Sequence, residues 1–207
     1  MRFRLGPIPE EPNFHPEREG WTRLREPGPL AIQLIALPAA FGALLVNGTL
    51  LARVVPGGLS AVLAAVLGLP AWVWLVVLLA AFPAHEALHV VLHPDGGLSE
   101  RSVIGVWPSK AVFYANYEAA MTRNRQLLVL AGPYVGLALL PIGLQALGAA
   151  SGWDANGIAM LRMLSLVGAV LASGDLIGLA LLAAQAPAGA VVRNQGWRTY
   201  WRVAARK

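Results

Sequence analysis

Long apolar stretches constrain the fold of this chain more than any other feature. A helix needs about 20 mostly apolar residues to cross a bilayer, where every backbone polar group must be satisfied internally. Four stretches have the required length and are expected to be spans: about 30–52, 70–93, 127–150 and 160–184. Hydrophobic residues make up 57% of the chain and charged residues 13%, against about 25% charged in a soluble domain. We therefore expect an all-α membrane protein with about four transmembrane helices.

The four spans divide the chain into three parts. Residues 1–29 contain five glutamates and no apolar core, so they are expected to form an irregular polar segment rather than a signal peptide. Residues 30–184 form the transmembrane domain, and residues 185–207 form a basic tail. Gly68 and Pro70 interrupt a long apolar run, because both residues break helices. The preceding segment, 59–67, is either a short helix at the outer surface or part of a tilted entry.

The basic residues predict the orientation in the membrane. Of the 16 lysines and arginines, all but Arg53 and Arg162 lie before the first span, between spans two and three, or after span four. The positive-inside rule then places both termini and the 94–126 loop in the cytoplasm. The same distribution accounts for the net charge of +5 without a nucleic-acid partner. We expect a multi-pass protein of a prokaryotic plasma membrane, with lipid as a partner and its oligomeric state left open.

The loop between spans two and three predicts a short cytoplasmic β-hairpin. Residues 102–107 and 111–117 are rich in Val, Ile, Phe and Tyr, and Pro108-Ser109-Lys110 between them is typical of a turn. An exposed edge of this hairpin could pair with an extended substrate strand. The alternative is a hairpin that only lies among the lipid headgroups.

The second span carries the motif His85-Glu86-Ala87-Leu88-His89. Residues four apart lie on one face of a helix, so the two imidazoles can bind one metal ion. The glutamate between them can take a proton from a water at the metal, as a general base. The chain has no cysteine, which excludes thiolate ligands and a cysteine nucleophile. The motif therefore predicts a site for one Zn²⁺ at His85 and His89, with Glu86 as the catalytic residue.

A catalytic zinc needs a third protein ligand, and two residues compete for that position. Asp175 lies in the fourth span, at about the same depth from the outer surface as His85. His93 lies eight residues beyond His85, about 12 Å along an unbroken helix, which is too far to share the ion. We favour Asp175 and keep His93 as the alternative.

Other interpretations of these polar residues remain open. A non-catalytic metal-binding or transport-related membrane protein would use the same ligands without hydrolysis. In an accessory membrane protein, the histidines and carboxyl groups would only form hydrogen bonds between packed helices.

Two segments together resemble a known family: His85–His89 in one span, and Ser173-Gly174-Asp175-Leu176 in a later one. They look like the membrane zincin peptidases, a family distantly similar to the site-2 intramembrane zinc metalloproteases. Weaker matches are Leu130–Tyr134 and Gln195-Gly196-Trp197. The resemblance covers about residues 70 to 200 and implies a zinc-dependent metalloendopeptidase that cleaves membrane-protein or peptide substrates. It also implies zinc binding by His85 and His89, a general-base role for Glu86, and a family aspartate at Asp175.

Overall fold

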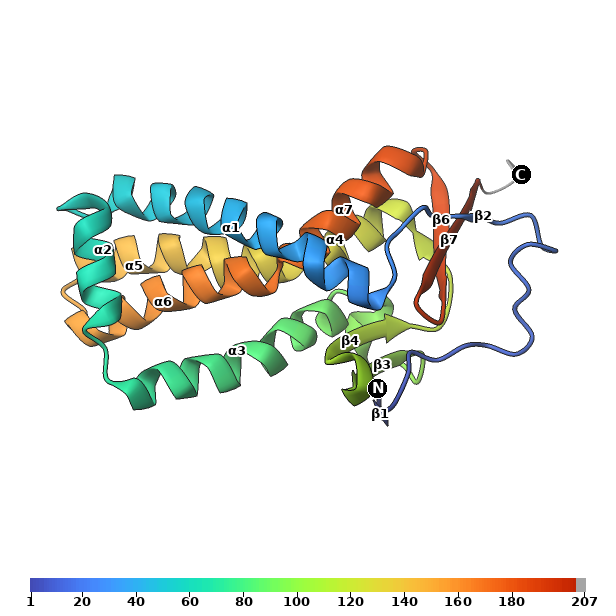
Figure 1. The fold of residues 1–207 in the computed structure, drawn as a ribbon, viewed down its shortest axis with the longest axis horizontal. Coiled ribbons are helices and arrows are strands. Elements are labelled where there is room, and N and C mark those ends of the chain that lie inside the picture. The colour runs from blue at the N-terminus through green and yellow to red at the C-terminus, as the bar shows by residue number, and fades with distance from the viewer. Residues whose placement is uncertain (204–207) are drawn as a thin grey trace. The chain divides into compact units, whose positions relative to one another are not determined.

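The structure is a computed structural model that describes residues 1–203 (Figure 1). The chain is mostly helical and divides into two compact units, which are described separately. Unit 1 comprises Met1–Ile35, Glu86–Gly132 and the segment from Gly174 onward, and unit 2 comprises Ala36–His85 and Pro133–Ser173.

Unit 2 is built from helices alone. It contains most of α1 (Pro29–Val54) and α3 (Ala71–Val91), together with α2 (Gly58–Leu67), η3 (Tyr134–Leu139, a π-helix), α5 (Leu140–Ala150) and α6 (Ala155–Leu171). Its apolar core includes Leu51, Val62 and Met163, which are almost completely buried. A polar cluster also lies inside: the Asn47 amide donates to Ser165 Oγ at 3.0 Å and accepts from the Tyr134 hydroxyl at 2.7 Å. Asn47, Ser165 and Tyr134 therefore all have hydrogen-bond partners, as polar groups in an apolar interior require.

Unit 1 combines helix ends with two small sheets. The first sheet has the order β1-β3-β4, from β1 (Arg2–Leu5), β3 (Ser102–Trp107) and β4 (Val112–Tyr117). The second has the order β2-β7-β6-β5, from β2 (Thr22–Arg23), β7 (Arg198–Val203), β6 (Ala190–Gln195) and β5 (Met121–Thr122). Helices α4 (Arg123–Pro133) and α7 (Ser173–Gln185) pack on the second sheet through a cluster that includes Leu182, Ala186 and Val192. A short 3₁₀ turn, η1 (Pro94–Gly97), follows α3.

These sheets correct the expectation of an all-α fold. The predicted hairpin is present as β3 and β4, joined by a 3₁₀ turn, η2 (Pro108–Lys110). Its position at the cytoplasmic surface stays a prediction. The N-terminal segment is not irregular throughout, because β1 pairs with β3 and β2 pairs with β7. The predicted tail likewise contains the β6–β7 hairpin. These strands form through backbone pairing between residues far apart in the sequence. A local sequence pattern cannot predict such pairing.

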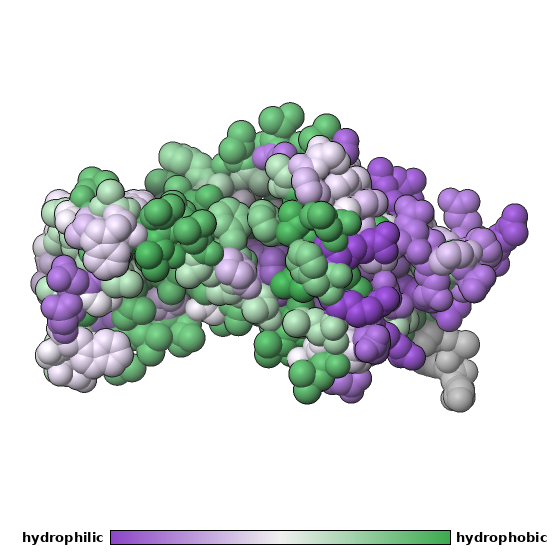
Figure 2. Space-filling model, turned by 90° about the horizontal axis from the view of Figure 1, so that it is seen from below, coloured by the Kyte–Doolittle hydropathy of each residue, from purple (hydrophilic) through white to green (hydrophobic). Residues whose placement is uncertain are grey.

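Within residues 1–203, three helical segments are long and apolar enough to cross a membrane: Pro29–Val54, Ala71–Val91 and Arg123–Ala150. The fourth predicted span, 160–184, is two helices, α6 and α7, separated at Ala172. Counting this pair as one broken span gives up to four crossings. The segment 59–67 is helical within α2. Figure 2 shows mostly hydrophobic side chains along the helices of unit 2, with some hydrophilic ones at their far end, and many hydrophilic side chains over unit 1.

Candidate metal centre

Helix α3 carries the motif and continues without a break through it, from Ala71 to Val91. His85 and His89 are therefore one helical turn apart on the same face of one helix. Both side chains are buried, with 7% and 6% exposure. Glu86, the next residue after His85, is equally buried. Because the three residues share a helix, their relative placement follows from helix geometry.

Asp175 lies in the first turn of α7, close to the point where α6 and α7 separate. The first turn of a helix presents unpaired N–H groups and a partial positive charge, which stabilise a carboxylate. The break in the predicted fourth span thus gives Asp175 a favourable electrostatic position. An unbroken helix would offer its carboxylate no such terminus.

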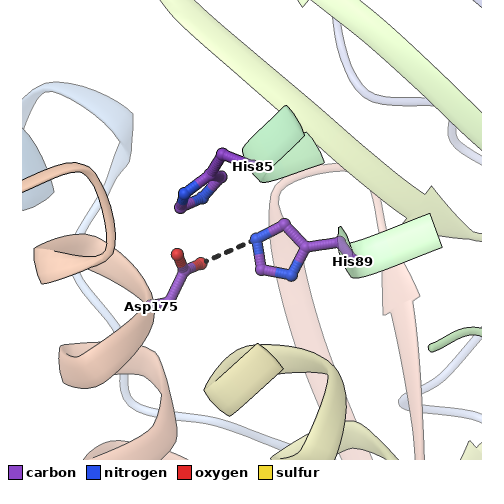
Figure 3. A group of neighbouring side chains, drawn as sticks. All are labelled: His85, His89 and Asp175. Atoms are coloured by element: carbon purple, nitrogen blue, oxygen red, sulfur yellow. Dashed lines mark ion pairs between the residues drawn. The ribbon is translucent and has the colours of Figure 1, made fainter. Parts of the chain in front are cut away.

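These residues meet in one cluster (Figure 3). Each of His85, His89 and Asp175 offers one ligand atom, and these atoms all lie within 4.8 Å of one another. His89 Nε2 lies 3.2 Å from Asp175 Oδ1. Two ligand atoms of a tetrahedral zinc with bonds of about 2.0–2.1 Å are about 3.3 Å apart, so this pair already has a suitable separation. Two imidazoles and one carboxylate form a donor set that zinc accepts, with a fourth position left for water.

A backbone carbonyl of α4 orients the His89 ring. His89 Nδ1 lies 2.9 Å from the Val129 carbonyl oxygen, inside unit 1. Since a carbonyl only accepts, Nδ1 carries the proton and the lone pair belongs to Nε2, the atom that faces Asp175. Metal-binding histidines commonly have their second nitrogen held in this way. Sequence reasoning missed this contact because a backbone carbonyl leaves no trace in the residue pattern.

Arg125, one turn before Val129 on α4, holds the end of α3. Its Nε donates to the Leu92 carbonyl at 2.6 Å, and its terminal amino group donates to the His93 carbonyl at 2.9 Å. The last carbonyls of a helix have no partner within the helix, and a cation near them also opposes the helix dipole. Helix α4 therefore fixes both the ring of His89 and the terminus of the helix that carries it.

His93, the alternative ligand, lies outside this cluster. It is 1% exposed, its Nδ1 lies 3.1 Å from Ser102 Oγ, and its ring contacts that of Tyr117. Burial, the largest cause, and the nearby Arg125 charge lower the pKa of His93 to about 4, so the ring is neutral. Its position connects the end of α3 to the start of β3, which is a structural role.

Comparison with known proteins identifies a family match over the part of the chain that contains the site. A family model described as "Putative zincin peptidase" matches residues 78–191, which is more than half of the chain and includes the whole cluster. No curated protein and no solved structure shows a significant match. The family description indicates a zinc-dependent metallopeptidase. On the extent of this match, the chain belongs to the family of putative zincin peptidases.

Proposed function

We propose that this chain is a membrane-embedded zinc metalloendopeptidase that hydrolyses peptide bonds of membrane or membrane-proximal proteins. The observation that carries the proposal is the meeting of two histidines from one apolar helix with an aspartate from another, within 4.8 Å. The family match supports the same reaction class.

The ligands in this proposal are His85, His89 and Asp175. A zinc ion bound there would polarise the scissile carbonyl and lower the pKa of an attacking water. His85 and His89 are buried and Asp175 is partly buried, which favours ligation, because a metal ion compensates the cost of burying their charge and polarity. His89 binds through Nε2, since its Nδ1 proton is held by the Val129 carbonyl.

Glu86 is the proposed general base. It follows His85 directly on α3 and is buried, so its carboxylate acts in surroundings with little competing water. Glu86 takes a proton from the attacking water while the oxygen forms a bond to the peptide carbon. It then returns that proton to the amine nitrogen as the C–N bond breaks.

The membrane location rests on the exposure of the apolar helices. In an 18-residue apolar stretch of α1, only 6% of the residues are buried inside the protein. The corresponding shares are 39% in Ala71–Val91 and 28% in Arg123–Ala150. Leucine and phenylalanine side chains exposed along so great a length need an apolar solvent, which lipid provides. With the distribution of basic residues, this supports a multi-pass arrangement with cytoplasmic termini.

The substrate is proposed to bind as an extended strand beside β4. This strand is an edge of the three-stranded sheet, so in the part of the chain that the structure describes, one side of its backbone has no partner strand in that sheet. An extended peptide can add to such an edge through main-chain hydrogen bonds. A helical transmembrane substrate would first have to unwind.

The experiment compares three purified, full-length proteins in lipid vesicles: wild type, Glu86→Gln and His89→Ala, with the exposed Glu17→Gln as matched control. Bound zinc is measured by elemental analysis, and hydrolysis by cleavage of labelled casein and of a quenched single-span peptide. Wild type and Glu17→Gln should bind one zinc and cleave. Glu86→Gln should keep its zinc and lose at least about 10²-fold in rate, the usual contribution of a general base. His89→Ala should lose both zinc and activity.

Two results would contradict the proposal. Zinc retained in His89→Ala at the wild-type ratio would remove the metal site from this cluster. Stoichiometric zinc without cleavage of either probe by wild type would favour a non-catalytic metal-binding protein. In cleavage run in ¹⁸O-labelled water, one labelled oxygen should enter each new carboxyl group, and its absence would exclude hydrolysis.

A further inference from the structure

The two sides of the three-stranded sheet of unit 1 differ in burial: one is mostly buried along β3 and β4, and the other is buried at one end only. Register assigns the faces, because directly paired residues of neighbouring strands point to the same side. One side carries Val103, Asn116 and Tyr114, which are all buried. The other side is buried at its Ser102 and Tyr117 end. The rest of that side is defined here as the apolar sheet face and consists of Phe3, Leu5, Ile104, Val106, Phe113 and Ala115.

The largest side chains of the apolar sheet face are exposed. Phe3 is 70% exposed, Leu5 71% and Phe113 50%. Single exposed hydrophobic residues are ordinary, but several large ones on one side of a small sheet mark a surface that contacts something apolar. At the buried end of the same side, the His93 ring contacts Tyr117 and its Nδ1 lies 3.1 Å from Ser102 Oγ, so unit 1 packs against that end.

The first strand is amphipathic over its whole length, with the sequence Arg2-Phe3-Arg4-Leu5. Alternation along a strand sends the two apolar side chains to one face and the two arginines to the other. Arg2 is fixed there: its side chain pairs with Glu118 and donates to the Glu100 carbonyl. Because β1 is paired with β3 and Arg2 is held on one side, Phe3 and Leu5 point to the other side.

The tip of the hairpin lies beside the beginning of a candidate span. Gln33, in the second turn of α1, donates through Nε2 to the Lys110 carbonyl at 2.6 Å, and both residues belong to unit 1. Two further span ends are joined to this sheet by short connections: α3 ends at Val91, eleven residues before β3 begins, and the segment Arg123–Ala150 begins six residues after β4 ends.

We propose that the apolar sheet face lies on the lipid, at the boundary between headgroups and acyl chains. The partner is the bilayer itself, since the face is tied to the point where α1 enters it and consists of aliphatic and aromatic side chains, as interfacial elements do. This inference rests on the membrane placement in the proposed function, and is independent of metal binding and hydrolysis. It assigns the sheet a second role, that of holding the hydrophilic part of unit 1 at the membrane surface.

The absence of cysteine from the chain makes a direct test possible. Single cysteines replace Phe3, Leu5 or Phe113 in the full-length protein and are labelled with the fluorophore bimane. Leu37→Cys on α1, exposed at 66%, is the lipid control, and the exposed Glu17→Cys is the water control. The proteins are placed in phosphatidylcholine–phosphatidylglycerol vesicles. Quenching by doxyl groups on the lipid chains is compared with quenching by iodide equilibrated across the vesicles.

The three sheet positions should gain quenching by lipid and lose quenching by iodide relative to Glu17→Cys. Iodide quenching equal to that of Glu17→Cys would overturn the inference. Protection from iodide without lipid quenching would place protein on the face, either a second copy or a substrate, and would also overturn it. Leu37→Cys separates the two proposals. If it is quenched by lipid while the sheet positions are quenched by iodide, only the sheet contact is rejected. If Leu37→Cys itself is quenched by iodide and not by lipid, the membrane placement is rejected.

Discussion

Replacing Arg125 by methionine tests how α4 supports the metal centre. The change keeps an unbranched side chain and removes the two hydrogen bonds to the carbonyls of Leu92 and His93. A hydrogen bond from a charged donor contributes about 1.5–3 kcal/mol, so the two together contribute about 3–6 kcal/mol. Arg125 is partly exposed, and water can replace part of this loss. We expect the free energy of unfolding to fall by about 2–4 kcal/mol.

The same substitution should weaken zinc binding although Arg125 is not a ligand. Without the Arg125 hydrogen bonds, the end of α3 can move relative to α4. This movement lengthens the hydrogen bond from His89 Nδ1 to the Val129 carbonyl. Loss of such a supporting contact typically costs about 10–100-fold in metal affinity. Unfolding is followed by circular dichroism in detergent with added denaturant, and zinc affinity by competition with a chromogenic chelator.

Two variants make the comparison specific. Arg123→Met, on the same helix, removes a hydrogen bond from the arginine side chain to the Ala183 carbonyl at 3.0 Å. This substitution should leave zinc affinity unchanged. Arg125→Lys keeps the charge but can reach one carbonyl at a time, so its losses should lie between those of wild type and Arg125→Met. The reasoning is refuted if Arg125→Met binds zinc like wild type and loses no more stability than Arg123→Met.

Three further predictions concern packing, pH and substrate. Gly168→Ala should destabilise the protein by about 3 kcal/mol in thermal unfolding, because the new Cβ would lie 2.6 Å from backbone atoms of Leu137, whereas Gly143→Ala, with open space around it, should have little effect. The pKa of His93 falls from 6.5 to about 4 on folding, so the unfolded chain takes up this proton first as the pH falls. The contribution of neutral His93 to the free energy of unfolding should therefore be fully present above pH 6.5 and be lost as the pH falls towards 4. Melting temperatures of chelator-treated protein should show this decline more strongly in wild type than in His93→Gln. Val112→Pro, on β4, should reduce cleavage of the single-span peptide while bound zinc stays constant; unchanged cleavage would reject strand addition.

Hydropathy was sufficient to predict the long helices. The first predicted span, 30–52, corresponds to α1 at Pro29–Val54, and the second, 70–93, to α3 at Ala71–Val91. Helices in lipid must satisfy their backbone internally, so length and apolar composition alone define them. The motif on α3 likewise predicted that His85 and His89 share a face, because that follows from a spacing of four residues.

Features that depend on contacts between distant segments were not predictable in this way. Strands β1 and β2 contain four and two residues, and each gains its partner from a strand about 100 to 180 residues away. The separation of α6 from α7 at Ala172 occurs inside an apolar sequence that is compatible with one continuous helix. Asp175 was chosen from its depth, and its place in the first turn of α7 comes from that separation.

The pairing of β2 with β7 has a consequence for the order in which the molecule is made. Thr22 is aligned with Trp201, so the four-stranded sheet cannot close until the residues around Trp201 have left the ribosome. The helix with the two histidines is complete more than 80 residues before Asp175 is translated. A nascent chain therefore carries the motif without its third partner until α7 has been made, and the three side chains can come together only after that. The candidate metal centre thus stays incomplete while the first sheet and the earlier helices are already translated.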